Sequence, residues 1–414
     1  MAISARPAFL PVLLVAIAQV LASHPGAGAN QVRLGVEVLR DAPPDWIRGR
    51  RVGLITNASG VDSRLRSTAE SLHEDPAIDL CALYAPEHGI RAAAAAGADV
   101  AHQRDPLTGL PVFSLYGATR RPTPEMLEPI DIMLIDIQDI GLRPYTYIST
   151  MAEAMEACRD AGRPFVVLDR PNPLGGQVLE GPVLDPAYRS FVGIHPIPYR
   201  HGMTIGELAR LFNEAFGIGC ELRVVAMTGW RRDVLWDDTG LIWVPTSPHV
   251  PHAGTLLPMA STGTLGELQF LSEGVGCALP FEVVGAAWID PPALAAELRQ
   301  RELPGASFRP VWFRPRYGPF ADTDCGGVQI HVTDPAGYRS FTTGLHLLHA
   351  VRKLYPDRDP FTDNPRLDMF RKVVGTDRID RGLAAGRDPD ALEAEWLPEL
   401  DRFRELRRPF LLYE

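Results

Sequence analysis

One apolar run in this sequence ends in side chains that could do acid/base chemistry. The run IDLCALYA (78–85) is followed by Pro86, Glu87, His88 and Gly89. A carboxylic acid beside an imidazole at such a place could act as an acid/base pair, hold a metal ion or only form a polar turn. Because a proline precedes Glu87 and a histidine and a glycine follow it, the carboxylate has few local capping partners. We therefore interpret Glu87 as a functional residue.

Three other apolar runs carry polar residues at comparable positions. These are Asn57 after the run 52–56, Asp136, Gln138 and Asp139 around the end of the run 130–139, and Asp169, Arg170 and Asn172 after the run 164–168. Ligands of open parallel sheets bind just beyond the carboxyl ends of the strands, so we predict one shared site there. Structural interpretations exist as well: Asn57 as a turn cap, Asp136 as an acceptor for backbone N–H groups, and Asp169 in a local ion pair.

Several motifs of metal, nucleophilic serine and dinucleotide sites are absent from the sequence, which limits the kinds of chemistry expected at this site. The sequence has no H-x-H or H-E-x-x-H pattern for a metal, no G-x-S-x-G for a nucleophilic serine, and no G-x-G-x-x-G after its first apolar run. We expect no metal ion and no cofactor. Carboxylate chemistry remains, in which one partly buried acid stays protonated and another is ionised, as in glycoside hydrolysis. We assign the acid to Glu87 and the second carboxylate to Asp139, with Asp136 as its rival. The sequence does not choose between a retaining, an inverting and a substrate-assisted mechanism.

The predicted strand ends form the rim of the shared site. Aromatic and basic residues near this rim are consistent with a sugar ligand. Aromatic residues more often belong to the core, but they also form apolar platforms, and the candidates are Tyr145, Tyr147, Trp230, Trp236 and Trp243. Arginine can hold a ligand carboxylate through two parallel hydrogen bonds, and the rim offers Arg91, Arg143 and Arg170. His201 precedes a predicted helix and is either a neighbour of its cap or a further site residue.

Alternating strand and helix patterns must position these residues. Apolar strand-like runs lie at 52–57, 78–87, 112–117, 130–139, 164–173 and 221–227, and helical patterns lie between them at 62–74, 146–162 and 203–217. Near-continuous apolar strands that alternate with helices predict a doubly wound α/β domain with a parallel sheet covered on both faces. After about residue 235 the pattern changes to Trp/Pro/Gly-rich segments with a strand at 326–334 and a helix at 344–355. We predict a smaller α+β domain over residues 236–414.

Composition excludes several classes of partner. The chain has 414 residues, a length typical of two domains, and 41 basic against 51 acidic residues give a net charge of −10. An acidic protein without a basic stripe is a poor candidate for nucleic acid or anionic membranes. The five cysteines contain no C-x-x-C, so we expect no disulfide framework, at most one or two bridges and no structural zinc. The oligomeric state is not indicated.

The first 29 residues have the pattern of a secretory signal peptide. Arg6 precedes the apolar stretch FLPVLLVAIAQVLA, which is too short for a comfortable membrane span, and residues 27–29 fit a small-x-small cleavage site. No cysteine follows at a place where a lipid anchor would be attached. We predict a signal peptide at 1–29 and a mature protein from Asn30 that is secreted or periplasmic and has no membrane anchor.

Several longer segments, spread over nearly the whole chain after residue 29, together form a distinctive sequence pattern. They are GLITNASGVD (53–62), LYAPEHGIR (83–91), DPLTGLPVFSLYG (105–117), RRPTPEML (120–127), DIQDIGLRPYTYISTM (136–151), VLDRPNPLGG (167–176), EGPVLDP (180–186), SFVGIHPIPYRHGMTIGELARLFNE (190–214), GGVQIHVTD (326–334) and RELRRPFLLYE (404–414). Together they resemble the NamZ-type exo-β-N-acetylmuramidases of bacterial peptidoglycan recycling.

The resemblance implies a fold, an activity and a catalytic residue. It implies a Rossmann-like catalytic domain, here residues 30–235, a smaller auxiliary domain at 236–414, and a site in the cleft between them. The implied activity removes N-acetylmuramic acid from the non-reducing ends of peptidoglycan fragments, and the glutamate of the P-E-H-G segment, here Glu87, is the implied catalytic acid. The substrate carries a lactyl carboxylate, which would give the rim arginines a ligand. We include Asn57, His88, Arg91, Gln138, Tyr147, Asp169, Arg170, Asn172, His201 and Glu273 as candidate substrate-binding residues.

One segment departs from the family pattern. Where the family reads E-G-T-N-x-S-E-G-R-G-T, this chain keeps Glu267 and Glu273 but has Leu268-Gln269-Phe270 for G-T-N and Val275 for the arginine. Valine cannot replace an arginine that pairs with a carboxylate, so the muramic acid preference is in doubt. Two alternatives stay open: an exo-hydrolase with another N-acetylhexosamine preference, and a periplasmic sugar-binding or muropeptide-binding protein without catalysis.

Overall fold

Six parallel strands and one antiparallel edge strand form the larger sheet of the protein. The computed structural model describes residues 32–95, 97–98 and 103–414, so the predicted signal peptide lies outside the described residues. The strands are β1 (Arg51–Thr56), β2 (Asp79–Ala85), β3 (Gln103–Arg104), β4 (Pro111–Ser114), β5 (Ile132–Asp136), β6 (Phe165–Leu168) and β9 (Leu222–Val225). Their order is β3-β4-β2-β1-β5-β6-β9, and only β3 is antiparallel to its neighbour. The chain therefore winds outward from β1 in both directions, which confirms the predicted doubly wound sheet.

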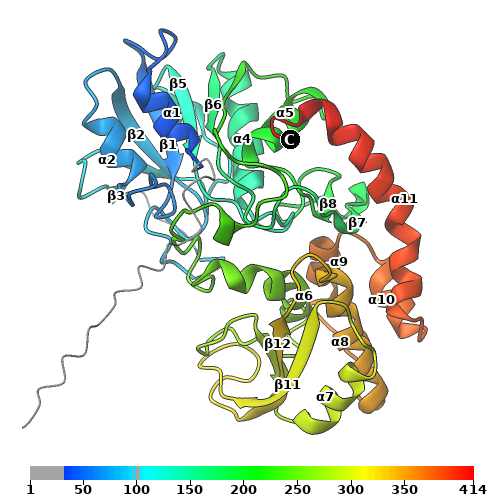
Figure 1. The fold of residues 1–414 in the computed structure, drawn as a ribbon. Helices are drawn as coiled ribbons and strands as arrows, with labels where there is room; N and C mark the ends of the chain where they lie inside the picture. The colour runs from blue at the N-terminus through cyan, green and yellow to red at the C-terminus, as the bar shows by residue number, and fades with distance from the viewer. Residues whose placement is uncertain (1–31, 96, 99–102) are drawn as a thin grey trace, which may run out of the picture. The chain divides into compact units, whose positions relative to one another are not determined.

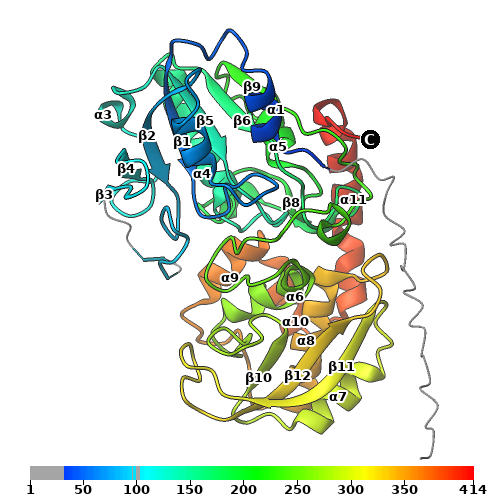
Figure 2. The ribbon, with the colours of Figure 1, turned by 60° about the vertical axis from the view of Figure 1, so that its left-hand side comes forward.

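Alternating side chains of each strand enter two different cores. Val52 and Leu54 of β1 pack on one face with residues of α1 (Gly35–Asp41) and α2 (Thr68–His73). Ile55 points to the opposite core, which contains α4 (Tyr147–Asp160) and α5 (Ile205–Glu214). The strands are nearly continuously apolar because each face is covered by helices, as Figures 1 and 2 show.

The helix predicted at 62–74 is shorter than expected. Helix α2 begins only at Thr68. The Oδ1 atom of Asp62 accepts hydrogen bonds from the backbone nitrogens of Arg64 and Arg66, each at 2.9 Å. This local side-chain bonding stabilises a turn in place of the first helical turns.

A smaller antiparallel sheet with helices follows in the chain. Strands β10 (Val283–Ala286), β12 (Cys325–Val332) and β11 (Ala306–Phe313) lie in that order, accompanied by α6 (Leu256–Gly266), α7 (Pro291–Arg299) and α8 (Ser340–Leu354). Gly344 of α8 lies so close to α6 that an added Cβ would be 2.2 Å from the carbonyl oxygen of Ser261. The predicted α+β character of this region is confirmed.

Four further α-helices and a short two-stranded sheet belong to the described structure. The helices are α9 (Leu367–Val374), α10 (Arg378–Ala384) and α11 (Pro389–Arg407), and α3 (Pro124–Leu127) is a single turn. Strands β7 (Glu180–Val183) and β8 (Pro198–Arg200) pair with each other. Glu180 binds Arg200 at 2.7 Å and accepts hydrogen bonds from the hydroxyl of Ser340 and the backbone nitrogen of Phe341. An acidic side chain thus caps the N-terminus of α8 and joins it to the hairpin.

Residues near the C-terminus return to the larger sheet (Figure 1). The hydroxyl of Tyr413 donates to Asp169 at 2.6 Å, and the backbone nitrogen of Leu412 donates to Glu207 at 2.9 Å. The described residues from Val32 to Glu414 form one compact unit. The division into domains at residue 235 therefore stays a prediction.

All five cysteines lie in the described part of the chain and are free. Among the described residues, no helix is long and apolar enough to cross a membrane.

Candidate active site

The residue singled out first, Glu87, lines a cavity of about 640 Å³. This volume falls in the range of small-molecule sites. The cavity walls come from the end of β2, from the chain after β4, from α6 and from α9. Its lining includes two acids, Glu87 and Glu267, and apolar or aromatic surface from Ile140, Leu142, Tyr145, Tyr199, Met259 and Phe281. The site thus combines convergent carboxyl groups with apolar faces.

Glu87 is held firmly at the end of β2. Its side chain is buried, its Oε1 accepts a hydrogen bond from the backbone nitrogen of Gly97 at 2.8 Å, and its Oε2 bonds the hydroxyl of Thr146 at 2.6 Å. Burial raises the pKa of the nearby Tyr116 phenol, and the charge of Glu87 adds to this shift. The sharp turn after β2 is made by His88, whose φ is +68°. The imidazole Nδ1 of His88 lies 2.7 Å from the carbonyl oxygen of Ala94, and the side chain also lines the cavity.

The second acid of the cavity is Glu267, which ends helix α6. Its Oε2 atom forms an ion pair with Arg366 at 3.0 Å. Burial raises the pKa of Glu267, Arg366 opposes this shift, and the negative charge of Glu87 adds to it. The two carboxyl groups are therefore electrostatic neighbours, and the charge of Glu87 disfavours the ionised form of Glu267. Sequence reasoning did not assign a role to Glu267, although its retention in the altered segment 267–277 was a signal.

The two aspartates named as partners of Glu87 do not line this cavity. Asp136 is buried and accepts hydrogen bonds from Arg170 at 2.5 and 2.8 Å and from the hydroxyl of Thr68. Asp139 accepts a hydrogen bond from the backbone nitrogen of Gly141 at 2.8 Å and lies 3.5 Å from the imidazole of His201. Asp136 is thus engaged through both oxygens, whereas Asp139 is bonded through Oδ2 and its buried Oδ1 has no hydrogen-bond partner among the described residues.

The arginines proposed for a ligand carboxylate are also engaged elsewhere. Arg91 forms an ion pair with Asp105 at 2.7 Å, and Arg170 is bound to Asp136. Arg143 is fully buried and donates to the carbonyl oxygens of Pro182, Ile197 and Val373, and burial lowers its pKa to about 9. None of the three lines the cavity that holds Glu87.

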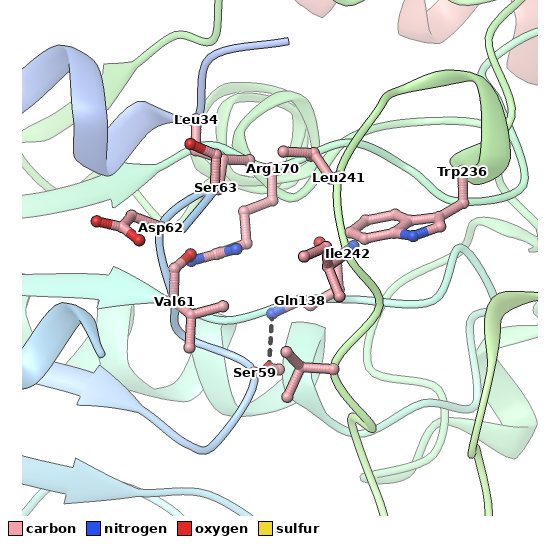
Figure 3. Close-up of a pocket in the computed structure, with 11 residues that line it drawn as sticks. Leu34, Ser59, Val61, Asp62, Ser63, Gln138, Arg170, Trp236, Leu241 and Ile242 are labelled. Atoms are coloured by element: carbon pink, nitrogen blue, oxygen red, sulfur yellow. Dashed lines mark hydrogen bonds between the residues drawn. The ribbon is translucent and has the colours of Figure 1, made fainter. Parts of the chain in front are cut away.

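Figure 3 shows where the polar ends of β1, β5 and β6 meet, at the point where the winding of the sheet reverses. Ser59, Gln138 and Arg170 converge there, and the backbone nitrogen of Gln138 donates to the hydroxyl of Ser59 at 3.1 Å. Trp236, Leu241, Ile242 and Val244 also line this place, which keeps about 10 Å³ of free space. We call it the switch-point crevice. It has room for about one water molecule and none for a sugar.

Two predicted residues form a support behind the cavity wall. Asn57 donates to the phenolic oxygen of Tyr147 at 2.7 Å, and the hydroxyl of Tyr147 donates to the carbonyl oxygen of Thr246. The ring of Tyr147 packs edge-on against Tyr145, which does line the cavity, at a centroid distance of 4.7 Å. Asn57 and Tyr147 therefore fix a wall residue and do not themselves line the cavity.

The remaining candidates lie away from the cavity. Asn172 bonds the backbone of Met203 and Leu174. Asp169 accepts hydrogen bonds from Arg170, Thr204, Gly206 and Tyr413, yet full burial raises its pKa to about 7. Glu273 packs against Gly266, where an added Cβ would lie 2.6 Å from its carboxyl carbon, and burial raises its pKa to about 7.

The substituted positions of the altered segment also lie outside the cavity lining. Leu268 is buried in the core, and the ring of Phe270 packs on Trp288 at a centroid distance of 5.3 Å. Val275 does not line the cavity either. Among the described residues, no group of three or more His, Cys, Asp or Glu could hold a metal ion.

Comparisons with known proteins found matches over most of the chain. Residues 52–254 match the family described as exo-beta-N-acetylmuramidase NamZ, N-terminal, and residues 259–413 match its C-terminal counterpart. The chain is 43% identical, over 92% of its own length and 92% of the relative, to the peptidoglycan beta-N-acetylmuramidase NamZ of Bacillus subtilis (strain 168). Two crystal structures of DUF1343 family proteins from Bacteroides fragilis NCTC 9343 are similar in fold. They have TM-scores of 0.87 and 0.76 at 42% and 27% identity, and each alignment covers 93% of this chain and 99% of the other.

Proposed function

Because the chain belongs to the exo-β-N-acetylmuramidase NamZ family, we propose that it is a glycoside hydrolase that removes N-acetylmuramic acid from the non-reducing ends of peptidoglycan fragments. The observation that carries the proposal is the cavity in which the buried carboxyl group of Glu87 faces the same space as Glu267. Paired carboxyl groups in one sugar-sized cavity provide the acid and the ionised group that glycoside hydrolysis requires.

Glu87 is the proposed general acid. Its Oε1 is fixed by the backbone nitrogen of Gly97, which can only donate. Its Oε2 bonds the hydroxyl of Thr146, which can accept as well as donate, so that this oxygen can carry a proton. The proton on Oε2 would pass to the glycosidic oxygen as the bond breaks.

Glu267 is the proposed ionised partner, because Arg366 stabilises its negative charge in the cavity. Asp139 and Asp136, the partners predicted from the sequence, are each bonded within the protein and do not line the cavity. The apolar surface of Leu142, Met259 and the Tyr145 ring offers contacts for the faces of a sugar ring and for an acetamido methyl group.

Neither alternative function gains support from the lining of the cavity. The altered positions 268–270 and 275 lie outside it, so their side chains remove no contact from the described wall. A binding protein without catalysis would not need two acidic side chains in the same cavity. A shift of specificity to another N-acetylhexosamine remains an outcome that experiment can recognise.

The proposal is tested by hydrolysis of para-nitrophenyl β-N-acetylmuramide, with the corresponding glucosaminide as control. We expect release from the muramide, and a loss of about 100-fold to 10,000-fold in kcat for Glu87→Gln with little change in binding. Release only from the glucosaminide would indicate a different specificity. No release from either substrate, together with measurable muropeptide binding, would contradict catalysis.

We also propose that the mature protein acts outside the cytoplasm. The support is the charged, apolar and small-residue pattern of residues 1–29. Expression of the full chain followed by cell fractionation and N-terminal sequencing tests this proposal, and we expect a mature N-terminus at Asn30. A chain that retains residues 1–29 in the cytoplasmic fraction would contradict it.

A further inference from the structure

The substrate of the proposed function differs from other N-acetylhexosaminides by one negative charge. N-acetylmuramic acid carries a lactyl carboxylate on its ring. A site that selects this sugar needs a cation whose charge is not already neutralised by the protein. Among the described residues, the cations that line the cavity are Arg120, Arg366 and Lys372.

Two of these cations already have acidic partners. Arg366 pairs with Glu267 at 3.0 Å, and Lys372 pairs with Asp368 at 2.6 Å, one turn away on α9. Arg120 forms no ion pair with a described residue. Its guanidinium lies over the rings of Tyr116 and Phe191, with its central carbon 5.0 and 4.5 Å from their centroids. Aromatic rings hold a guanidinium in place but leave its N–H groups free to donate.

Arg120 is also close to the proposed acid. Tyr116 lies close to both groups, because the guanidinium of Arg120 lies over its ring and the charge of Glu87 adds to the raised pKa of its phenol. The acid and the cation therefore occupy one wall of the cavity. A sugar whose glycosidic oxygen meets Glu87 would bring its ring substituents to the same wall.

The other side of Arg120 faces a second space. Together with Phe191 and Ser190, it lines both the cavity and an open groove of about 750 Å³. Arg120 thus lies between the cavity and the groove, and its side chain is exposed to solvent. A carboxylate that projects from the sugar can reach it without displacing an internal partner.

We propose that Arg120 is the residue that selects a carboxylate-bearing N-acetylhexosamine, by binding the lactyl carboxylate of the sugar through its guanidinium. This inference rests on the proposed function and adds a specificity-determining residue to it. It also replaces the arginines that the sequence placed near the rim, each of which is bound to protein groups.

The contact between Arg120 and the lactyl carboxylate is tested by combining one change in the substrate with one change in the protein. One change converts the carboxylate of para-nitrophenyl β-N-acetylmuramide into its primary carboxamide, which removes the charge and keeps the size. The other is Arg120→Gln. We expect the wild-type protein to prefer the acid over the amide by about 10-fold to 100-fold in kcat/KM, the range of a charge-assisted hydrogen bond. In Arg120→Gln this preference disappears, and in Arg120→Lys part of it remains because the charge is kept and the planar fork is lost.

Controls separate this inference from the proposed function. Arg121→Gln is the matched control, because Arg121 is the adjacent arginine but pairs with Glu156 and Asp160, and it should keep the preference. Thermal melting verifies that each variant folds. A preference that persists in Arg120→Gln, or that disappears only in Lys372→Gln, would overturn the inference. Equal wild-type rates on acid and amide would overturn it while leaving the proposed function intact. A wild-type protein that hydrolyses neither compound would contradict both.

Discussion

The switch-point crevice and the Glu87 cavity lie at the same edge of one sheet but have opposite character. The crevice receives the polar ends of β1, β5 and β6, and it retains only about 10 Å³ of space. The cavity receives the end of β2 and holds about 640 Å³. In the crevice every charge is paired inside the protein, with Arg170 on Asp136 as the central contact. In the cavity Glu87 has hydrogen-bond partners but forms no ion pair with a described residue.

The difference shows that a polar strand end does not identify a site by itself. Ligands of doubly wound sheets usually bind where the winding reverses, but here Trp236 and the following residues cover that place. The open space lies one strand away, beside β2. What distinguishes the two regions is whether a neighbouring segment supplies partners for the polar groups or leaves room for a ligand.

The largest effect expected from this comparison concerns Glu267 in the cavity. Glu267→Gln should lower kcat on the muramide by about 100-fold to 10,000-fold, because the ionised partner of the acid is lost. Melting should change little, since the side chain is only partly buried and its loss relieves repulsion from Glu87. A kcat within threefold of the wild type would assign the partner role to another group.

In the crevice, a substitution should lower stability strongly and change kcat little. Arg170→Met leaves Asp136 buried without its cation, so we expect a loss of about 3–5 kcal/mol in the free energy of unfolding, measured with denaturant. The kcat of the protein that remains folded should change by less than tenfold. Adding Asp136→Asn to this variant should recover part of the stability. A large fall in kcat at unchanged stability would make the crevice part of the active site.

The strand ends on both sides of this contrast could be predicted from the sequence, but the partners that fill the crevice or line the cavity could not. The strands and the position of Glu87 followed from apolar runs and their ends. The pairing of Asp136 with Arg170 could not be recognised, because an aspartate in a strand has the same sequence pattern whether it binds an arginine or a ligand. Glu267 and Arg120 were missed because tertiary packing brings them to Glu87 from chain segments about 180 and 33 residues away, beyond the reach of periodicity.

A smaller effect is expected at the end of β6, beside the crevice. Tyr413→Phe removes one of the hydrogen-bond donors to the buried Asp169. We expect a loss of about 1–3 kcal/mol in the free energy of unfolding at pH 8, where Asp169 is mostly ionised. The kcat should be unaffected. Unchanged stability would mean that water satisfies Asp169 in place of the phenol.

The smallest effect is a pH dependence of stability at Glu273, away from the cavity. The pKa of Glu273 is raised by burial from 4.5 to about 7 in the folded protein. Between these pH values the folded state binds more protons than the unfolded state, so this group makes stability fall as pH rises through the window. Glu273→Gln should remove that contribution, on the order of 1 kcal/mol between pH 5 and pH 8. Parallel unfolding curves for the two proteins at both pH values would show that the carboxyl group is not buried as described.

The bond between Tyr413 and Asp169 has a consequence for the order of events during synthesis. These residues are 244 positions apart in the chain, and Leu412 and Glu207 make a second contact of the same kind. When the strands of the parallel sheet have been translated, the nascent chain still lacks the Tyr413 hydroxyl that donates to Asp169. The larger sheet can assemble early but cannot reach its final stability until residues 412 and 413 are available. Nascent chains of this protein should therefore remain susceptible to proteases, and accessible to chaperones or an export machinery, until translation has passed this point.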